Sequence, residues 1–216
     1  MIEYLVSNFN RDVAITYLLS TREIIFTPMP NPYGYAKNKR QELTISKTRN
    51  KKSYRDPKDD FPYNTRNMSP AYCMNTVAGR AHYRLFTDNL FVTAISFHGS
   101  GLYPAAIAYP WNGKKYEVTK ENPDFQAFKN LGSVMQEESG DDYYTLGNVA
   151  ETTYPMDASL TDWAYAASWD DSTLSACKPQ TLPELPSDFF TKTTTENIAT
   201  AIFRVETYYN ENEDGE

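Results

Sequence analysis

The chain has 216 residues, of which 40% are hydrophobic and 14% aromatic, so it can bury the core of at least one globular domain. Its 21 basic and 28 acidic residues give a formal net charge of -7, which offers no overall electrostatic support for nucleic-acid binding. No segment approaches the roughly 20 consecutive apolar residues of a membrane-spanning helix. The composition therefore excludes a nucleic-acid role and a helical membrane span.

The first part of the chain predicts helix, then strand, then turn. Apolar residues recur at helical spacing over residues 2–19, with a break near residues 8–12. Residues 23–27 predict a short strand, closed by a Pro- and Gly-containing turn at residues 28–34. No basic segment or N-cap precedes the first helix, so we expect no signal peptide and a start inside a domain.

The middle of the chain predicts a long polar loop to about residue 69, including a basic stretch at residues 47–55 that is typical of a solvated loop. A helix is predicted next, because apolar residues recur at helical spacing and would form one face of it. The residues on that face are Met74, Val77, Ala81 and Leu85.

The second half alternates strands and helices. Residues 90–97 are apolar at consecutive positions, which predicts a strand covered by helices on both faces. A helix with Phe125, Phe128, Leu131 and Met135 on one face and a last strand at residues 199–207 follow. This alternation predicts a layered α/β domain. We expect it to occupy residues 1–210, with a surface insertion at residues 168–195 and an acidic tail at residues 211–216.

Two further features concern the compartment. Cys73 and Cys177 are equally compatible with two buried thiols and with a disulfide between them. The triplet Asn67-Met68-Ser69 matches a glycosylation acceptor and favours a secretory context for the full-length protein.

Five segments carry a pattern with chemical meaning. They are NPYGY at residues 31–35, DPKDDFP at 56–62, ISFHG at 95–99, Tyr154 followed by ASLTDWAY at 158–165, and FRVET at 203–207. In this order they resemble the zinc metallocarboxypeptidases of the carboxypeptidase A type. The first is similar to the family's N-P-D-G-[YF] turn, the fourth to its G-S-x-D-W-x-Y segment, and the fifth to its F-x-x-E strand. The resemblance spans residues 31–207 and implies the zinc carboxypeptidase fold, incomplete at its N-terminal end. That fold is a three-layer α/β domain with a mixed, mostly parallel central sheet between helices.

The resemblance also implies roles for four residues. His98 would be a zinc ligand, and Glu206 the general base and acid of peptide hydrolysis. Tyr154 would close over the end of the substrate, and Arg40 would stabilise the oxyanion. The implied cofactor is zinc, which polarises the scissile carbonyl, and the implied substrate is the C-terminus of a peptide or protein. A monomer in the secretory pathway is expected.

Each of these residues also has a structural interpretation. A single histidine that ends an apolar strand is commonly a hydrogen-bonded structural residue, and Glu206 is also compatible with an edge charge beside Arg204. Tyr154 is one of 17 tyrosines, so its residue type alone carries little information. The other histidine, His82, lies between Arg80 and Tyr83 on the predicted helix and is most simply a surface residue.

The chain departs from the family at two places. The first two zinc ligands of the family come from an H-x-x-E motif before the N-P-D-G turn, and no histidine precedes Asn31. Lys58-Asp59 replaces the Asn-Arg pair that binds the substrate carboxylate in the family. The arginine guanidinium, which can donate two parallel N–H bonds to a carboxylate, is thus replaced by the ammonium of Lys58 beside the negative charge of Asp59. We therefore expect this chain to be inactive. A pseudoenzyme that binds peptides or proteins is the first alternative, and an unrelated α/β binding protein is the second.

Overall fold

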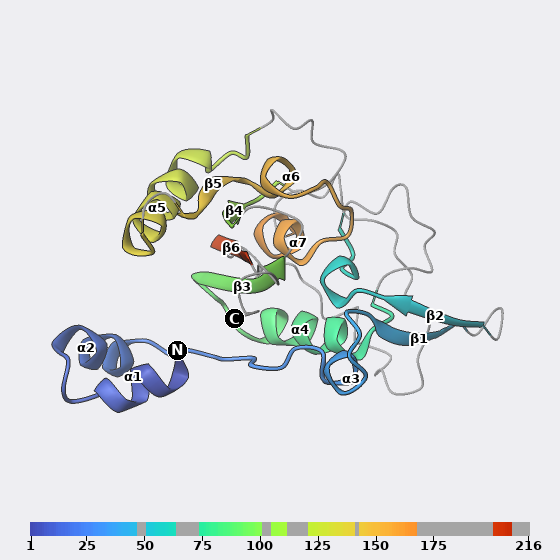
Figure 1. The fold of residues 1–216 in the computed structure, drawn as a ribbon, viewed down its shortest axis with the longest axis horizontal. Helices are drawn as coiled ribbons and strands as arrows, with labels where there is room; N and C mark the ends of the chain where they lie inside the picture. The colour runs from blue at the N-terminus through green and yellow to red at the C-terminus, as the bar shows by residue number, and fades with distance from the viewer. Residues whose placement is uncertain are drawn as a thin grey trace, which may run out of the picture. The chain divides into compact units, whose positions relative to one another are not determined.

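The computed structural model describes most of the chain (Figure 1), in seven ranges: residues 1–46, 51–63, 74–100, 105–111, 121–140, 143–167 and 201–208. The predicted insertion, acidic tail, glycosylation triplet and both cysteines lie outside these residues. The chain divides into two compact units, Met1–Lys39 and Arg40–Glu216, and each is described by itself. The predicted domain boundaries stay a prediction. None of the described helices has the length and apolar character needed to cross a membrane.

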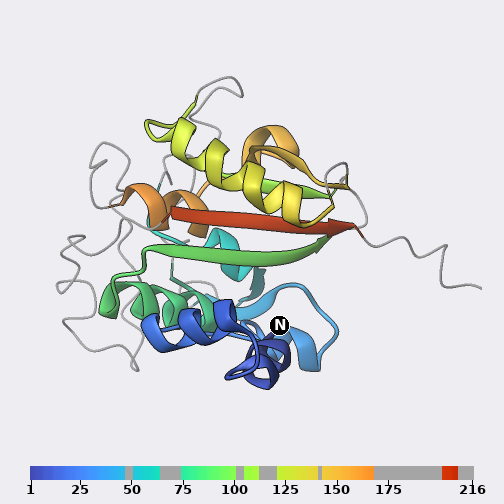
Figure 2. The same cartoon turned by 90° about the vertical axis from the view of Figure 1, so that its left-hand side faces the viewer.

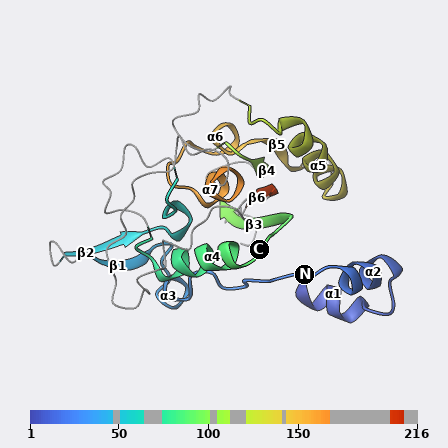
Figure 3. The ribbon, with the colours of Figure 1, turned by 180° about the vertical axis from the view of Figure 1, so that it is seen from behind.

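The first unit contains the helices α1 (Ile2–Asn8), α2 (Val13–Thr21) and α3 (Pro32–Ala36). The predicted broken helix is confirmed, and α1 and α2 lie against each other (Figure 3). The break ends at Asp12, whose carboxylate caps α2 by accepting from the Ile15 N–H at 2.9 Å. The strand predicted at residues 23–27 is wrong, because that segment pairs with no other strand among the described residues.

The second unit begins with a two-stranded antiparallel ribbon formed by β1 (Glu42–Ser46) and β2 (Lys51–Arg55). The 3₁₀ helix η1 (Pro57–Asp59) follows it. The predicted polar loop over this region is therefore wrong. The loop was predicted because the segment has no apolar periodicity. Two strands close in sequence can pair through backbone hydrogen bonds even when few of their side chains are apolar.

The described residues of the second unit form four further helices: α4 (Val77–Asp88), α5 (Phe125–Glu138), α6 (Val149–Thr152) and α7 (Leu160–Ala166). The apolar periodicity predicted the helices α4 and α5 correctly, but not the face that α4 buries. Val77 is 64% exposed and Ala81 is exposed, whereas Ala78, Tyr83 and Phe86 are buried. The short helices α6 and α7 are capped by Asn148 and Ser159, whose side chains each accept a hydrogen bond from the backbone N–H three residues ahead.

The sheet of the second unit consists of β3 (Thr93–Ser100), β4 (Ala106–Tyr109), β5 (Thr145–Asn148) and β6 (Ala201–Tyr208). Its order is β3-β6-β4-β5. The pairs β3–β6 and β4–β5 are parallel, whereas β4 and β6 are antiparallel. The parallel β3 and β6 are the long green and red strands of Figure 2. A mixed, mostly parallel sheet with helices confirms the predicted α/β class.

The core is aromatic and lies around β6 and α7. Trp163 of α7 is 1% exposed, and its ring lies 5.0 Å from both Phe61 and Tyr83. On β3, by contrast, Ile95 and Phe97 are 46% and 57% exposed, so the prediction of a strand covered on both faces is wrong. Alternate side chains of a strand point to opposite faces, and on β3 the face with Ile95 and Phe97 is exposed, whereas the face with Ala94, Ser96 and His98 is half-buried.

Candidate functional site

The segment that carries Lys58 is fixed against the N-terminus of α4. The Asp60 carboxylate accepts hydrogen bonds from the Thr76 N–H at 2.7 Å and from the Thr76 hydroxyl at 2.8 Å. In η1 itself, the Lys58 N–H donates to Asp56 at 3.2 Å. Glu42 of β1 accepts from the first N–H groups of α4, which joins the ribbon to the same helix end. These contacts set the position of Lys58 through backbone and carboxylate groups.

Two cations meet at the hydroxyl of Tyr154. Lys58 Nζ donates to Tyr154 Oη at 3.1 Å, and Arg40 Nη2 donates to the same oxygen at 3.3 Å. Lys58 Nζ also lies 5.3 Å from the ring centroid, and the Arg204 guanidinium lies 5.9 Å from it. Burial raises the pKa of the Tyr154 phenol, but Lys58, Arg40 and Arg204 outweigh burial and lower that pKa overall. The environment of Tyr154 therefore favours negative charge.

Arg40 and Lys58 each form an ion pair with a carboxylate. Arg40 Nε lies 2.6 Å from Asp56, and Lys58 Nζ lies 2.9 and 3.0 Å from the two oxygens of Asp59. The Arg40 side chain is 60% exposed, whereas that of Lys58 is only 12% exposed. The group around Tyr154 thus has one cation that faces solvent and one that is largely covered.

His98 and Glu206 are direct neighbours in the sheet, because they pair in the parallel register of β3 and β6. The His98 ring contacts the Ser96 hydroxyl, with Nε2 and Oγ 2.8 Å apart. Burial lowers the pKa of His98 to about 3, assisted by the charges of Arg204, Lys58 and Arg40. The imidazole is therefore neutral at physiological pH. The side chain of Glu206 lies outside the described part of the structure.

The predicted site residues thus come together in two pairs, Arg40 with Tyr154 and His98 with Glu206. Charge links the pairs, because Arg40 acts on the pKa of His98. The sequence interpretation missed Arg204, which is 3% exposed. Its sequence pattern gave no signal, because a charge between two apolar residues of a predicted strand is also typical of a side chain on a solvated face.

The described residues do not fit a zinc centre. They contain no group of three or more histidine, cysteine, aspartate or glutamate residues able to hold a metal ion. The second histidine, His82, lies on α4, and its Nδ1 is 2.8 Å from the Ala78 carbonyl oxygen. A catalytic zinc needs three protein ligands, and His98 is the one histidine at the predicted position. No catalytic step through zinc follows from these residues.

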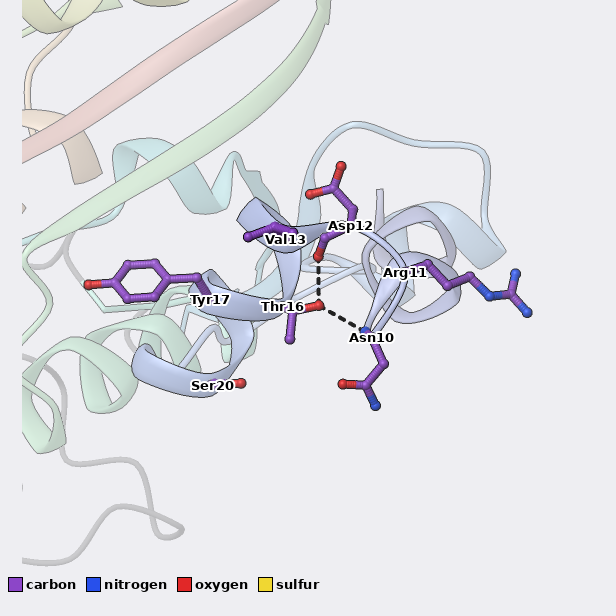
Figure 4. A pocket seen from close by; sticks show the side chains of 7 residues that line it. All are labelled: Asn10, Arg11, Asp12, Val13, Thr16, Tyr17 and Ser20. Atoms are coloured by element: carbon purple, nitrogen blue, oxygen red, sulfur yellow. Dashed lines mark hydrogen bonds between the residues drawn. The ribbon is translucent and has the colours of Figure 1, made fainter.

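A pocket in the first unit is a separate feature. It has a volume of about 410 Å³ and lies along the turn into α2 (Figure 4). The hydroxyl of Thr16 is used within the turn, donating to the Asp12 carbonyl at 2.6 Å and accepting from the Asn10 N–H at 2.9 Å. None of the predicted site residues lines this pocket, so it adds nothing to their chemistry.

Comparison with known proteins identifies the family. The sequence profile of the zinc carboxypeptidases matches residues 1–199. The chain belongs to the zinc carboxypeptidase family. Carboxypeptidase D of the duck Anas platyrhynchos is 24% identical over 159 residues, which cover 73% of this chain and 11% of that protein. Carboxypeptidase D of the mouse is 23% identical over 181 residues, covering 76% and 13% respectively. The chain therefore spans only about an eighth of the length of these relatives.

Membership in the family gives the cation group a chemical context. Zinc carboxypeptidases act on the C-terminal ends of peptides, and each such end carries a carboxylate. In this chain the donors near Tyr154 come from three segments far apart in sequence: Arg40 precedes β1, Lys58 lies in η1, and Arg204 lies in β6. The fold is what makes them neighbours.

Proposed function

We propose that this chain binds the C-terminal carboxylate of a peptide or protein at Arg40, Lys58, Arg204 and Tyr154, named here the Tyr154 cluster. The observation that carries the proposal is the meeting of Lys58 and Arg40 at the Tyr154 hydroxyl, at 3.1 and 3.3 Å. Hydrogen bonds between charged partners contribute about 1.5–3 kcal/mol each, so two of them suffice for specific recognition of a carboxylate.

The access to the cluster supports binding from solvent. Arg40 is mostly exposed and Lys58 mostly covered, so an entering carboxylate meets the guanidinium first and the less hydrated ammonium last. Asp56 and Asp59 hold the two cations in place before the ligand arrives. Such preorganisation lowers the ordering entropy that binding must overcome.

We further propose that the 216-residue polypeptide does not hydrolyse what it binds. Peptide hydrolysis in this family depends on zinc, and the described residues offer no group of three metal ligands. A zinc carboxypeptidase is the second candidate function. It is favoured by the neutral imidazole of His98 beside Glu206 in the sheet, the arrangement expected of a metal ligand and a general base.

The test is a binding assay with two labelled peptides that differ only in having a free or an amidated C-terminus. We expect the free acid to bind more tightly, and Lys58→Met to weaken its binding by about tenfold. Lys129→Met is the matched control, because Lys129 also lies over an aromatic ring, 5.6 Å from the centroid of Phe125, but outside the cluster. Equal affinity for acid and amide would refute the proposal. Release of the terminal residue, abolished by His98→Gln, would establish the second candidate.

Two properties of the whole protein accompany this proposal. We expect a monomer, to be measured by light scattering after size exclusion. We also expect passage through the secretory pathway, supported by the triplet Asn67-Met68-Ser69. Expression of the full-length protein in secreting cells should give a product whose mobility changes on removal of N-glycans, and an unchanged mobility would remove that support.

A further inference from the structure

The ammonium group of Lys58 is fully occupied by its neighbours among the described residues. A lysine ammonium has three N–H donors and no acceptor. Lys58 Nζ lies 2.9 and 3.0 Å from the two oxygens of Asp59, 3.1 Å from Tyr154 Oη and 3.2 Å from Met156 Sδ. These acceptors use all of its N–H donors. A carboxylate that enters from solvent can therefore bind Lys58 only by displacing one of the three residues.

Asp59 is the neighbour that an entering carboxylate would displace. Tyr154 and Met156 are uncharged acceptors, whereas Asp59 offers Lys58 the same chemical group as the C-terminus of a peptide. The side chain of Asp59 is 25% exposed, compared with 12% for that of Lys58, and Met156 is 7% exposed. An exchange of one carboxylate for the other keeps the ammonium paired and moves Asp59 into water, so no buried charge is left without a partner.

Asp56, the other carboxylate beside the Tyr154 cluster, makes different contacts. Its Oδ2 lies 2.6 Å from Arg40 Nε but 3.9 Å from Lys58 Nζ, which is beyond hydrogen-bond distance. Its Oδ1 accepts the backbone N–H of Lys58 at 3.2 Å. Asp56 thus positions Arg40 and the start of η1, and it leaves the donors of the Lys58 ammonium to other groups.

We propose that Asp59 is an internal competitor for the ligand: it occupies the Lys58 ammonium in the free protein, and a C-terminal carboxylate binds by taking its place. The inference rests on the proposed function, because it describes how the same site is regulated. Asp59 both positions Lys58 and blocks it. If Asp59 leaves Lys58 in about one molecule in ten, the apparent affinity for the ligand is about a tenth of the intrinsic affinity.

This competition makes binding depend on pH. Burial raises the pKa of Asp59 above its usual value of 3.8 and outweighs the opposing charges of Lys58 and Arg55. The neighbouring charge of Asp56 raises that pKa further. The terminal carboxyl of a peptide has a pKa of about 3.5. On acidification Asp59 therefore protonates first and releases Lys58 while the ligand is still ionised, so binding strengthens before it weakens.

The experiment measures the affinity of a labelled peptide with a free C-terminus, and of its amide, for wild type and three variants at pH 7. Asp59→Asn keeps the size of the side chain and removes the competing charge, so it should bind the free acid about tenfold more tightly. Asp56→Asn removes an equal charge from the same neighbourhood but loosens Arg40, so it should weaken binding. Asp88→Asn removes an exposed carboxylate at the end of α4 and should leave the affinity unchanged.

A pH series on the wild type gives a second measurement that does not depend on any variant. The affinity for the free acid should rise as the pH is lowered from 7 to 4.5, and this rise should be smaller in Asp59→Asn. The variant retains Asp60, a buried carboxylate whose pKa is raised to about 6, so the difference between the two profiles isolates Asp59.

The outcomes separate the inference from the proposed function. The competitor role of Asp59 is overturned if Asp59→Asn binds the free acid no more tightly than wild type, or if Asp56→Asn gains as much affinity as Asp59→Asn. It is also overturned if the wild-type affinity does not increase on acidification, even where Asp59→Asn does not fold. In each of these cases a wild-type preference for acid over amide leaves the proposed function standing. If wild type binds acid and amide equally, both proposals are overturned.

Discussion

The buried carboxylate of Asp60 makes the stability of this chain dependent on pH in an unusual direction. Asp60 is fully buried, and its Oδ1 accepts no hydrogen bond from the described residues. Burial raises the pKa of Asp60 from 3.8 to about 6, although its hydrogen bonds from Thr76 and the nearby Arg55 charge oppose the increase. The folded state therefore holds this proton over a pH range in which the unfolded chain releases it.

The sign and size of the effect follow from this difference. Below pH 3.8 the group is protonated in both states; between about 4 and 6 only the unfolded state ionises, so the free energy of unfolding falls as the pH rises. A difference of about two pKa units corresponds to roughly 3 kcal/mol. In Asp60→Asn the titrating group is absent, so the variant should gain about that amount relative to wild type between pH 3.5 and pH 6.5.

The assay is urea unfolding followed by tryptophan fluorescence at a series of pH values, since Trp163 is buried and reports loss of the core. Wild type and variant share every other titrating group, including Asp59, whose pKa burial also raises. The difference between the two curves therefore isolates Asp60. A difference that stays constant from pH 3.5 to pH 6.5, or that moves in favour of wild type, would refute the reasoning.

Three further predictions concern the site and its support. Tyr154→Phe removes the shared hydroxyl but keeps the ring, so free-acid peptides should bind three- to tenfold more weakly in the same binding assay, about 1 kcal/mol; an unchanged affinity would exclude the hydroxyl from recognition. Gly79→Ala places a methyl group 2.6 Å from Thr76 Oγ1 and 3.0 Å from Asp60 Oδ2, so urea unfolding should show a loss of about 1 kcal/mol despite the better helix propensity of alanine, and a gain would contradict it. After dialysis the purified chain should retain less than one equivalent of zinc by mass spectrometry, because His98 lacks companion ligands among the described residues, and stoichiometric zinc would contradict this.

The parts of the fold that the sequence predicted are those in which local pattern and tertiary environment agree. The helices α4 and α5 were predicted from the helical spacing of apolar residues, and the structure buries Phe128 from the face predicted for α5. The buried face of α4 was not predicted, because the structure buries Tyr83 and Phe86 and leaves Val77 exposed. The strand prediction at residues 23–27 failed because an apolar segment forms a β-strand only when a partner strand satisfies its backbone hydrogen bonds. The ribbon β1–β2 was missed for the opposite reason, since its partner is adjacent in sequence and its residues are largely polar.

The site was predictable to the extent that motifs fix backbone position. The ISFHG and FRVET segments correctly indicated two strands, and the structure pairs His98 with Glu206 in their register. The contacts of Tyr154 were not predictable, because they depend on how η1 docks on α4 and on the path of β6. Arg204 has no motif of its own, and only its burial and its neighbours in space mark it as part of the site.

The contacts in the structure change the interpretation of the Lys58-Asp59 pair. From the sequence alone, the lysine is a weak substitute for an arginine fork, and the aspartate repels any carboxylate that approaches. In the structure Asp59 is bound by Lys58 itself, at 2.9 and 3.0 Å, so its charge is directed at the ammonium. Guanidinium groups reach Tyr154 from elsewhere, Arg40 at the hydroxyl and Arg204 over the ring. Cationic donors therefore surround the tyrosine despite the replacement, as the proposed recognition of a C-terminal carboxylate requires.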